Sequence, residues 1–230
     1  TDVNSEVANF IEQGDIPYRE EGVKEAFQAG HSVGWRTSIR DVVRESEIVF
    51  IAVQTPHSPR YEGCNTTPDA TRDFDYSFLT AALREAVAYC DSDLTIVVVS
   101  TVNPGTCVRE LEPIARQNAH VRLVYSPAFI AMGTTIDDFS NPEMVIVGTS
   151  DDAAYDLVRT LHGSIHQAPV VRLNLVSCEL VKMTYNTFIG LKIVFGNLIG
   201  EICEKLGGDA DEVVQALALA NYRLMSPKYL

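Results

Sequence analysis

The sequence lacks several features that would assign it to a class at once. No Gly-x-Gly-x-x-Gly run occurs among its 230 residues. It shows no signal peptide, and we find no apolar run long enough to span a bilayer. Its five cysteines and five histidines have no metal or redox spacing. We therefore expect no metal site, no secretion and no membrane partner, and we expect the cysteines to be free thiols in a reducing cytosol.

Basic residues are also scarce. The chain has 18 Lys and Arg against 31 Asp and Glu, which gives a formal net charge of −13. Such a surface repels nucleic acid and anionic membranes, so we expect neither as a partner. An anionic ligand must then be held by local groups such as a helix N-terminus. The length suits one large domain or two small ones with a substantial core.

Apolar strand patterns alternate with helical patterns up to Asn174. Helices are predicted at residues 5–13, 21–28, 75–89, 106–118 and 151–162. Strands are predicted at residues 32–37, 47–53, 94–99, 121–125, 143–147 and 170–173. The order predicts an α/β fold, with a mostly parallel sheet and helices on both faces. Residues 54–75 are rich in proline and predict a long loop, which in a compact domain is functional or mobile.

The pattern changes after Asn174. Residues 176–206 predict one continuous helix, about 45 Å long at the standard rise per residue. Apolar residues occupy nearly every face, which is typical of a helix buried on all sides. A chain of this size has difficulty covering such a helix, so we expect another subunit or a further domain to pack against it. Gly207 and Gly208 are expected to end it, and Asp209 to cap a last helix at residues 211–220.

The most informative run is STVNPGT at residues 100–106. It follows a buried strand, and ligands of open α/β sheets bind beside the carboxyl ends of strands. The run VFIAVQTP at residues 49–56 has the same form and ends in Thr55 and a proline. A hydroxyl residue, a Pro-Gly turn and a helix start at these positions indicate a small-molecule site near Thr55 and Thr101.

Lys182 and Asn186 lie four residues apart on the predicted long helix and therefore share one face. Both stand among apolar neighbours, where an amine or an amide is costly to bury without a partner or a function. Two interpretations stay open. The lysine reaches the surface and the asparagine lies at a helix contact, or both donate hydrogen bonds to a developing alkoxide in the cleft of Thr101. Glu179, three residues before Lys182, is a candidate ion-pair partner.

Several phrases, all in the same order, resemble the UDP-glucose/GDP-mannose dehydrogenase family. Each is weak alone, but together they span nearly the whole chain. They are GDIP at residues 14–17 with Glu20 and Gly22, FIAVQTP at 50–56, STVNPGT at 100–106, SPAFI at 126–130, NPEMVIVG at 141–148 and KMTYN at 182–186.

The resemblance implies an NAD-dependent oxidation of a nucleotide-sugar CH2OH group to a carboxylate. Two hydrides leave in succession, and a cysteine holds the intermediate as a thiohemiacetal and then a thioester. It implies a Rossmann-like NAD-binding domain at residues 1–174 and a central helical domain at 175–230, with a homodimer formed through the helix 176–206. It also implies a cytoplasmic enzyme of polysaccharide biosynthesis.

On the cofactor side, the resemblance assigns a role to three residues. Asp2 matches the acid that binds the adenosine ribose, although Asp2 taken alone suits a helix N-cap. Thr55 and Thr101 match threonines that line the cofactor, and Thr101 also matches the residue that positions a catalytic water.

On the substrate side, Lys182 and Asn186 match the pair that stabilises oxyanions. Phe129 and Ile130 match a loop that lies along the sugar. Two departures stand out: Ala128 replaces a glutamate that serves in acid–base chemistry, and Met132 replaces a second acid found in some members.

The glycine-rich turn, the first strand, the catalytic cysteine and the nucleotide-binding domain of the family are expected beyond the ends of this chain. We therefore expect the chain by itself to have little or no dehydrogenase activity. Two alternatives stay open. One is a β-hydroxyacid dehydrogenase-like enzyme, since that class also joins a dinucleotide-binding domain to a helix with Lys and Asn four apart. The other is a catalytically inactive binding or dimerisation module.

Overall fold

The structure is a computed structural model that describes residues 1–13, 20–29, 34–61 and 72–220. The GDIP phrase lies outside these residues. The chain forms two compact units, Thr1–Lys182 and Met183–Leu230. The first contains the sheet and the second begins inside the long helix, so each is described by itself.

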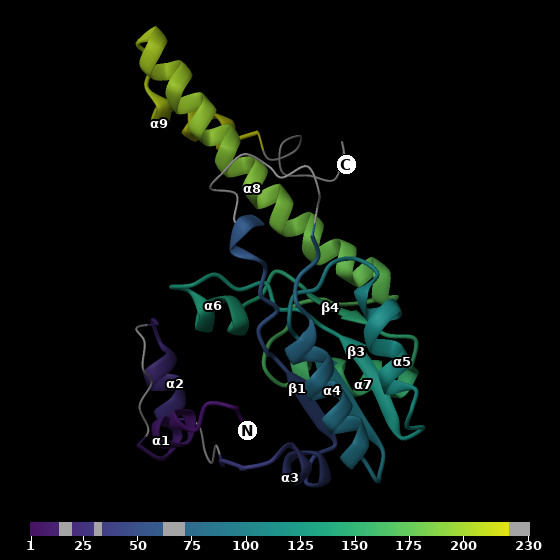
Figure 1. The fold of residues 1–230 in the computed structure, drawn as a ribbon. Coiled ribbons are helices and arrows are strands. Elements are labelled where there is room, and N and C mark those ends of the chain that lie inside the picture. The colour runs from purple at the N-terminus through teal and green to yellow at the C-terminus, as the bar shows by residue number, and fades with distance from the viewer. Residues whose placement is uncertain (14–19, 30–33, 62–71, 221–230) are drawn as a thin grey trace. The chain divides into compact units, whose positions relative to one another are not determined.

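The described residues of the first unit form a five-stranded sheet in the order β1-β2-β3-β4-β5 (Figure 1). Neighbouring strands β1, β2 and β3 are parallel, and β4 and β5 are parallel to each other. β4 meets β3 in the antiparallel direction at a single pair, Tyr125 with Gly148. The predicted α/β fold with a mostly parallel sheet is thus confirmed. The strands are β1 (Ile48–Ile51), β2 (Leu94–Val98), β3 (Val121–Tyr125), β4 (Val145–Gly148) and β5 (Val170–Leu173).

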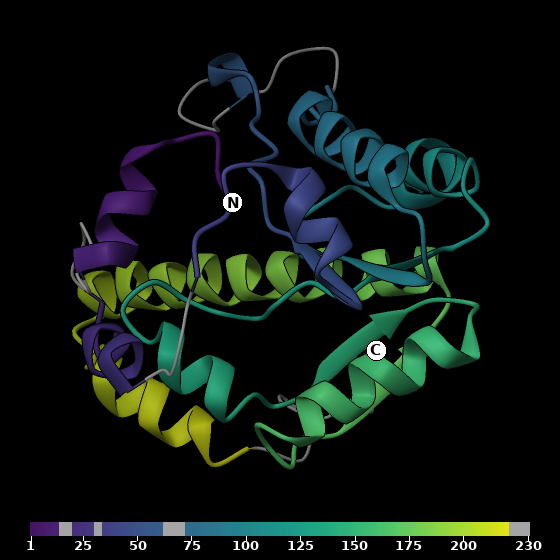
Figure 2. The same ribbon diagram turned by 90° about the horizontal axis from the view of Figure 1, so that it is seen from below.

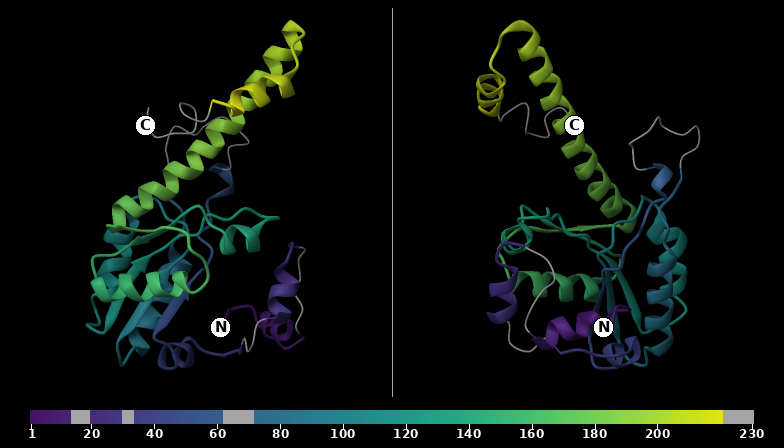
Figure 3. Two further views of the ribbon diagram at one scale, coloured as in Figure 1. Left: turned by 180° about the vertical axis from the view of Figure 1, so that it is seen from behind. Right: turned by 60° about the vertical axis from the view of Figure 1, so that its left-hand side comes forward.

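Helices cover both faces of the sheet (Figure 2; Figure 3, right). On one face, α3 (Ile39–Arg44), α4 (Ser77–Tyr89) and α5 (Glu112–Ala115) form a larger core with Ile96 and Val98. On the other face, α7 (Asp152–Gly163) forms a smaller core with Val97. Successive residues of a strand point to opposite faces, so a strand covered on both sides is apolar throughout. This explains why all five residues of β2 are buried.

The described residues of the first unit also include three more α-helices, of which two were predicted, and a short 3-10 helix, Pro59–Tyr61. The predicted helices are α1 (Glu6–Gln13) and α2 (Val23–Ala29), while α6 (Thr135–Ser140) was not predicted. The Glu20 carboxylate joins the last two, because it accepts hydrogen bonds from the backbone N–H groups of Gly133 (2.8 Å) and Thr135 (2.9 Å). A hydrogen bond from the Thr135 side chain, together with these backbone bonds, holds the pKa of Glu20 below its ordinary value.

The structure corrects two predicted elements and adds a helix between them. The strand at residues 32–37 is wrong for its described part, residues 34–37, which form no strand. α3 is a helix that was not predicted, with its N-terminus capped by Ser38, whose Oγ accepts from the Asp41 backbone N–H. The helix predicted at 106–118 is divided into a π-helical turn, Cys107–Leu111, and α5. Pro113 has no N–H to continue the regular ladder, and the wider turn accommodates it.

The long helix is α8 (Leu175–Leu206), close to its predicted range. Gly207 ends it with φ +75°, a conformation that glycine adopts without strain. Asp209 then caps α9 (Ala210–Ala218) by accepting from the N–H groups of Asp211 and Glu212. The capping residue is as predicted, and the helix ends two residues before its predicted end.

One expectation about α8 needs correction. It is long and apolar enough to cross a membrane by length and composition alone, contrary to the expectation that no such run exists. The described residues of this chain leave Leu191, Ile193 and Val194 each at least 60% exposed. The partner expected to cover it stays a prediction.

Candidate active site at the carboxyl end of the sheet

The ends of β1 and β2 are tied together by two hydroxyl groups. Ser100 Oγ donates to the carbonyl of Val53 (2.6 Å), and Thr55 Oγ1 donates to the carbonyl of Thr101 (2.7 Å). The structure thus brings together the two threonines singled out in the sequence. The Thr55 proton is committed to this bond, so its oxygen faces other groups only as an acceptor.

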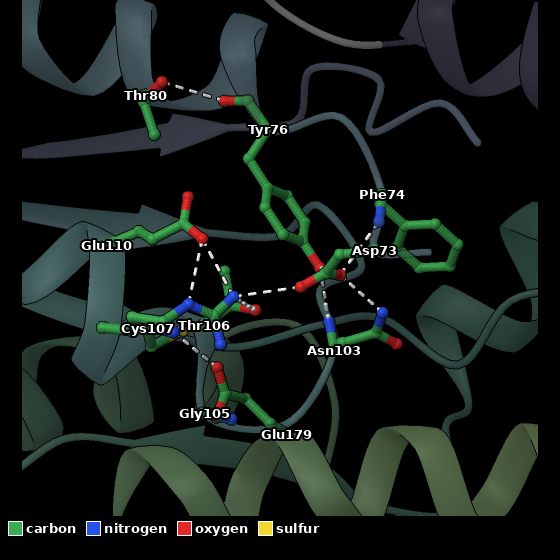
Figure 4. Close-up of polar contacts among 11 residues, drawn as sticks. Asp73, Phe74, Tyr76, Thr80, Asn103, Gly105, Thr106, Cys107, Glu110 and Glu179 are labelled. Atoms are coloured by element: carbon green, nitrogen blue, oxygen red, sulfur yellow. Dashed lines mark hydrogen bonds and ion pairs between the residues drawn. The ribbon is translucent and has the colours of Figure 1, made fainter. Parts of the chain in front are cut away.

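The turn after β2 is held by a buried acid from α8. Glu179 is completely buried, and its carboxylate accepts from the backbone N–H of Gly105 (2.6 Å) and of Cys107 (2.6 Å) (Figure 4). These groups open the helical segment after β2, where a negative charge is favourable. Glu179, the candidate ion-pair partner of Lys182, instead binds these two backbone N–H groups.

A second polar cluster holds the same turn from the other side (Figure 4). The Tyr76 hydroxyl donates to Asp73 (2.6 Å) and accepts from the Asn103 backbone N–H (3.0 Å). Asp73 also accepts from the Asn103 side-chain amide (2.6 Å) and from Arg109 (3.0 Å). Sequence reasoning missed this cluster. The available signal is the pair Asp73 and Tyr76 at the point where the long loop meets α4.

The pKa values of Tyr76 and Asp73 in this cluster are shifted in opposite directions. Burial, together with the hydrogen bond to Asp73, raises the pKa of Tyr76 to about 12. Burial also acts to raise the pKa of Asp73, but the hydrogen bonds from Tyr76 and Asn103 outweigh it and hold that pKa below its ordinary value. A neutral phenol therefore donates to an ionised carboxylate across the physiological range.

Lys182 lies under the loop that follows β3. Its Nζ donates to the carbonyl of Ala128 (2.7 Å) and lies 4.8 Å from the centre of the Phe129 ring. The residue is 7% exposed, so the interpretation in which it reaches the surface is wrong. Burial lowers the pKa of Lys182. The loop therefore contacts the lysine through the Ala128 carbonyl and the face of the Phe129 ring. The side chain of Ala128 itself is neither an acid nor a base.

The other residues singled out in the sequence are more exposed than Lys182. Phe129 is half-buried beside Lys182, whereas Ile130 is 48% exposed and Met132 is 97% exposed. Asp2 is exposed and accepts from the Asn4 backbone N–H (2.8 Å) in the turn before α1. Asn186 is exposed and belongs to the second compact unit.

The described residues contain four cysteines, and none is paired: Cys90, Cys107, Cys178 and Cys203 are buried free thiols. Burial raises the pKa of Cys107 and of Cys178, which keeps both thiols protonated and unreactive. Within the part of the chain that the structure describes, no three His, Cys, Asp or Glu side chains gather as metal ligands.

Side chains on loops at the carboxyl ends of parallel strands define the ligand-binding edge of a doubly wound α/β fold. The chain belongs to the UDP-glucose/GDP-mannose dehydrogenase family. Residues 1–166 match the model of the family's NAD binding domain, and residues 176–230 match the model of its central domain. The family predicted from the sequence is confirmed, and with it the expectation that the cofactor is NAD.

Relatives of known function are similar over almost the whole chain. The UDP-glucose 6-dehydrogenase of Rhizobium meliloti (strain 1021) is 31% identical, and the match covers 91% of this chain and 48% of that protein. The GDP-mannose 6-dehydrogenase of Pseudomonas savastanoi pv. phaseolicola is 28% identical, with 96% and 52% covered. The chain therefore spans about half the length of the curated relatives that it matches.

Two solved structures are similar in fold over nearly the whole chain. A ternary complex of GDP-mannose dehydrogenase from Pseudomonas aeruginosa superposes with a TM-score of 0.87 at 26% identity, covering 100% of this chain and 52% of that one. A UDP-glucose dehydrogenase from the archaeon Pyrobaculum islandicum gives a TM-score of 0.83 at 26% identity, with 95% and 50% covered.

Proposed function

We propose that the protein carrying this chain is an NAD-dependent nucleotide-sugar dehydrogenase, which oxidises a sugar CH2OH group to a carboxylate. One observation carries the proposal. The first turns of α8 contact the segments that follow two adjacent parallel strands. Glu179 binds the turn after β2, and Lys182 binds the loop after β3. An amine is thereby buried at the edge where the cofactor-lining threonines lie.

The side chains at this edge suit the nicotinamide end of NAD. Thr55 and Thr101 would line the cofactor, with the Thr55 oxygen open to accept a hydrogen bond from an amide or a ribose hydroxyl. The helix start after β2 is occupied by Glu179 and so is not open to the pyrophosphate. Asp2, which stands before α1, is proposed as the acid that binds the adenosine ribose.

NAD, when bound at this edge, would supply the hydride acceptor for both oxidations. The chain's own residues would act on the substrate's hydroxyl proton and on the negative charge of the alkoxide that forms. An ammonium has three donors, and Lys182 uses one on Ala128, which leaves donors for an alkoxide that forms beside it. We propose that Asn186 adds an amide donor and that Thr101 positions the water that supplies the second carboxylate oxygen. Phe129 and Ile130 are proposed to lie along the sugar.

The remaining proposals concern the whole protein. We propose an NAD-binding domain at residues 1–174 and a central domain at residues 175–230, paired with a second copy through residues 176–206 of α8. The exposed apolar side chains of that helix support such a pairing. A cytoplasmic enzyme of polysaccharide biosynthesis, without nucleic-acid or membrane partners, is consistent with the acidic composition.

The test is turnover by the complete native protein that contains these residues. NADH formation is followed with NAD and a panel of UDP- and GDP-sugars, and with small hydroxyacids as the competing substrate class. We expect two NADH per nucleotide sugar consumed. Lys182→Met should lower kcat by about 10²–10³-fold, while Lys205→Met, at an exposed lysine in the last turn of α8, should leave it unchanged. Turnover of hydroxyacids alone, or an active Lys182→Met variant, would contradict the proposal.

Ala128 favours the second candidate, a protein that binds its ligands without catalysis, because the family's acid is absent there. The same assay separates the two. If the wild-type protein binds NAD but forms no NADH, Ala128→Glu is expected to restore turnover. If the wild-type protein is active, the carboxylate is dispensable, and the water held by Thr101 is the group to test next.

A further inference from the structure

The most unusual buried group in the first unit is the carboxylate of Glu179. It has no exposed surface, and both its oxygens are used, one on Gly105 N–H and one on Cys107 N–H. Two of its other neighbours, Cys178 and Tyr125, offer no cation. A buried carboxylate is costly unless hydrogen bonds compensate for the loss of water, and here two short backbone bonds do so.

These bonds connect two parts of the site. Gly105 belongs to the turn that begins with Thr101, and Cys107 opens the helical segment that follows this turn. Glu179 lies one helical turn before Lys182 on α8. The Gly105 backbone has φ +90°, so the turn depends on a conformation that most residues adopt only at a cost. On its far side the turn is held by Tyr76, through the Asn103 N–H. Glu179 is therefore the contact that fixes the turn to the helix that carries the lysine.

We propose that Glu179 is a positioning residue that sets the distance between Thr101 and Lys182. The proposal rests on the function proposed for those two residues. It does not require Glu179 to touch substrate or cofactor, since its oxygens are committed to backbone N–H groups. Loss of these bonds would free the start of the helical segment after β2 from α8. The side chains of Thr101 and Lys182 could then move apart.

The first test is Glu179→Gln, measured in the complete native protein. The amide keeps the size of the side chain, but it retains one acceptor and turns a donor toward an N–H donor. We expect kcat to fall about tenfold to hundredfold, with KM for NAD unchanged. We also expect faster hydrogen exchange at residues 101–107. If this variant does not fold, Glu179→Asp, which keeps the charge, is used in the same assays.

The matched control is Asp151→Ala. Asp151 also caps a helix, because its carboxylate accepts from the Ala154 N–H (2.8 Å). However, α7 follows β4, which runs antiparallel to β3, so this cap lies at the opposite end of the sheet from Thr101. We expect a lower Tm with unchanged kcat. An equal loss of kcat in the control, or an unchanged kcat in Glu179→Gln, overturns the proposal.

A readout without turnover separates this proposal from the proposed function. Lys182 is buried, so reagents that acylate amines should modify it slowly in the wild-type protein. We expect faster acylation of Lys182 in Glu179→Gln and no change in Asp151→Ala, as measured by mass spectrometry of the modified peptide. If the wild-type protein turns over no nucleotide sugar, the dehydrogenase proposal fails while this result still decides whether Glu179 positions Lys182. An unchanged acylation rate overturns the positioning role.

Discussion

Replacing Gly148 with alanine tests how closely α8 packs on the sheet. Gly148 ends β4 beneath the first turn of α8. A Cβ added there would lie 2.7 Å from Cys178 Cβ, 3.2 Å from Cys178 Sγ and 3.4 Å from Leu175 Cα. Rotation of the thiol relieves only the contact with sulfur. The two Cβ atoms are fixed to their backbones, so either β4 or α8 must move.

Overpacking of this kind costs about 1–3 kcal/mol of unfolding free energy. For a chain of this size, each kcal/mol lowers Tm by about 2–4 °C, so we expect Gly148→Ala to lower it by about 2–12 °C. Urea unfolding followed by circular dichroism measures the free energy, and calorimetry measures the Tm. The control is Gly163→Ala, in the last turn of α7, where an added Cβ meets nothing within 4 Å. It should be neutral or stabilising by up to about 1 kcal/mol.

An unfolding free energy of Gly148→Ala equal to that of wild type, with an unchanged m-value, would refute this reasoning. It would mean that the first turn of α8 shifts without loss of packing. Because the same turns carry Glu179 and Lys182, we also expect the variant to lose activity in the dehydrogenase assay, even at temperatures where it is folded.

Three other predictions concern the polar groups around the site. Tyr76→Phe leaves the Asn103 backbone N–H without its partner and removes one of the hydrogen bonds that Asp73 accepts, so we expect it to lower the unfolding free energy by about 1–3 kcal/mol. Unchanged urea unfolding would contradict the role of the hydroxyl. The folded-state pKa of Lys182 lies below its ordinary 10.5, so between the two values the unfolded chain binds more protons and stability rises with pH. The unfolding free energy of wild type minus that of Lys182→Met should therefore increase from neutral pH toward pH 10.5, and a flat difference would count against it. The pKa of Asp73 is lowered instead, so its contribution is present above pH 3.8 and lost as pH falls through the folded value; wild type and Asp73→Asn should converge in acid unfolding.

Much of the fold follows from local patterns. β3 and β5 were predicted with their observed bounds, because short apolar runs rich in β-branched residues and bounded by turn signals favour strands. α8 was predicted within one residue, since a long apolar run without proline ends at a glycine pair. α3 and α6 have six residues each, too few for a helical period to stand out from the loops around them.

The candidate site was predictable in part. The order of strands placed Thr55 and Thr101 at one edge of the sheet, because parallel strands end on the same side. The partners of Glu179 and Lys182 were not predictable. A spacing of three residues on a helix favours an ion pair between them, yet each meets backbone groups more than 50 residues away in sequence.

The sequence by itself determined the family, the alternation of strands and helices, and the residue types available for chemistry. Tertiary structure alone decided which partner each buried polar group meets. The rotation of α8 about its own axis selects the side chains that face the strand ends. That rotation follows from close packing, above all where Cys178 lies against Gly148, and no local pattern encodes a contact between residues thirty positions apart.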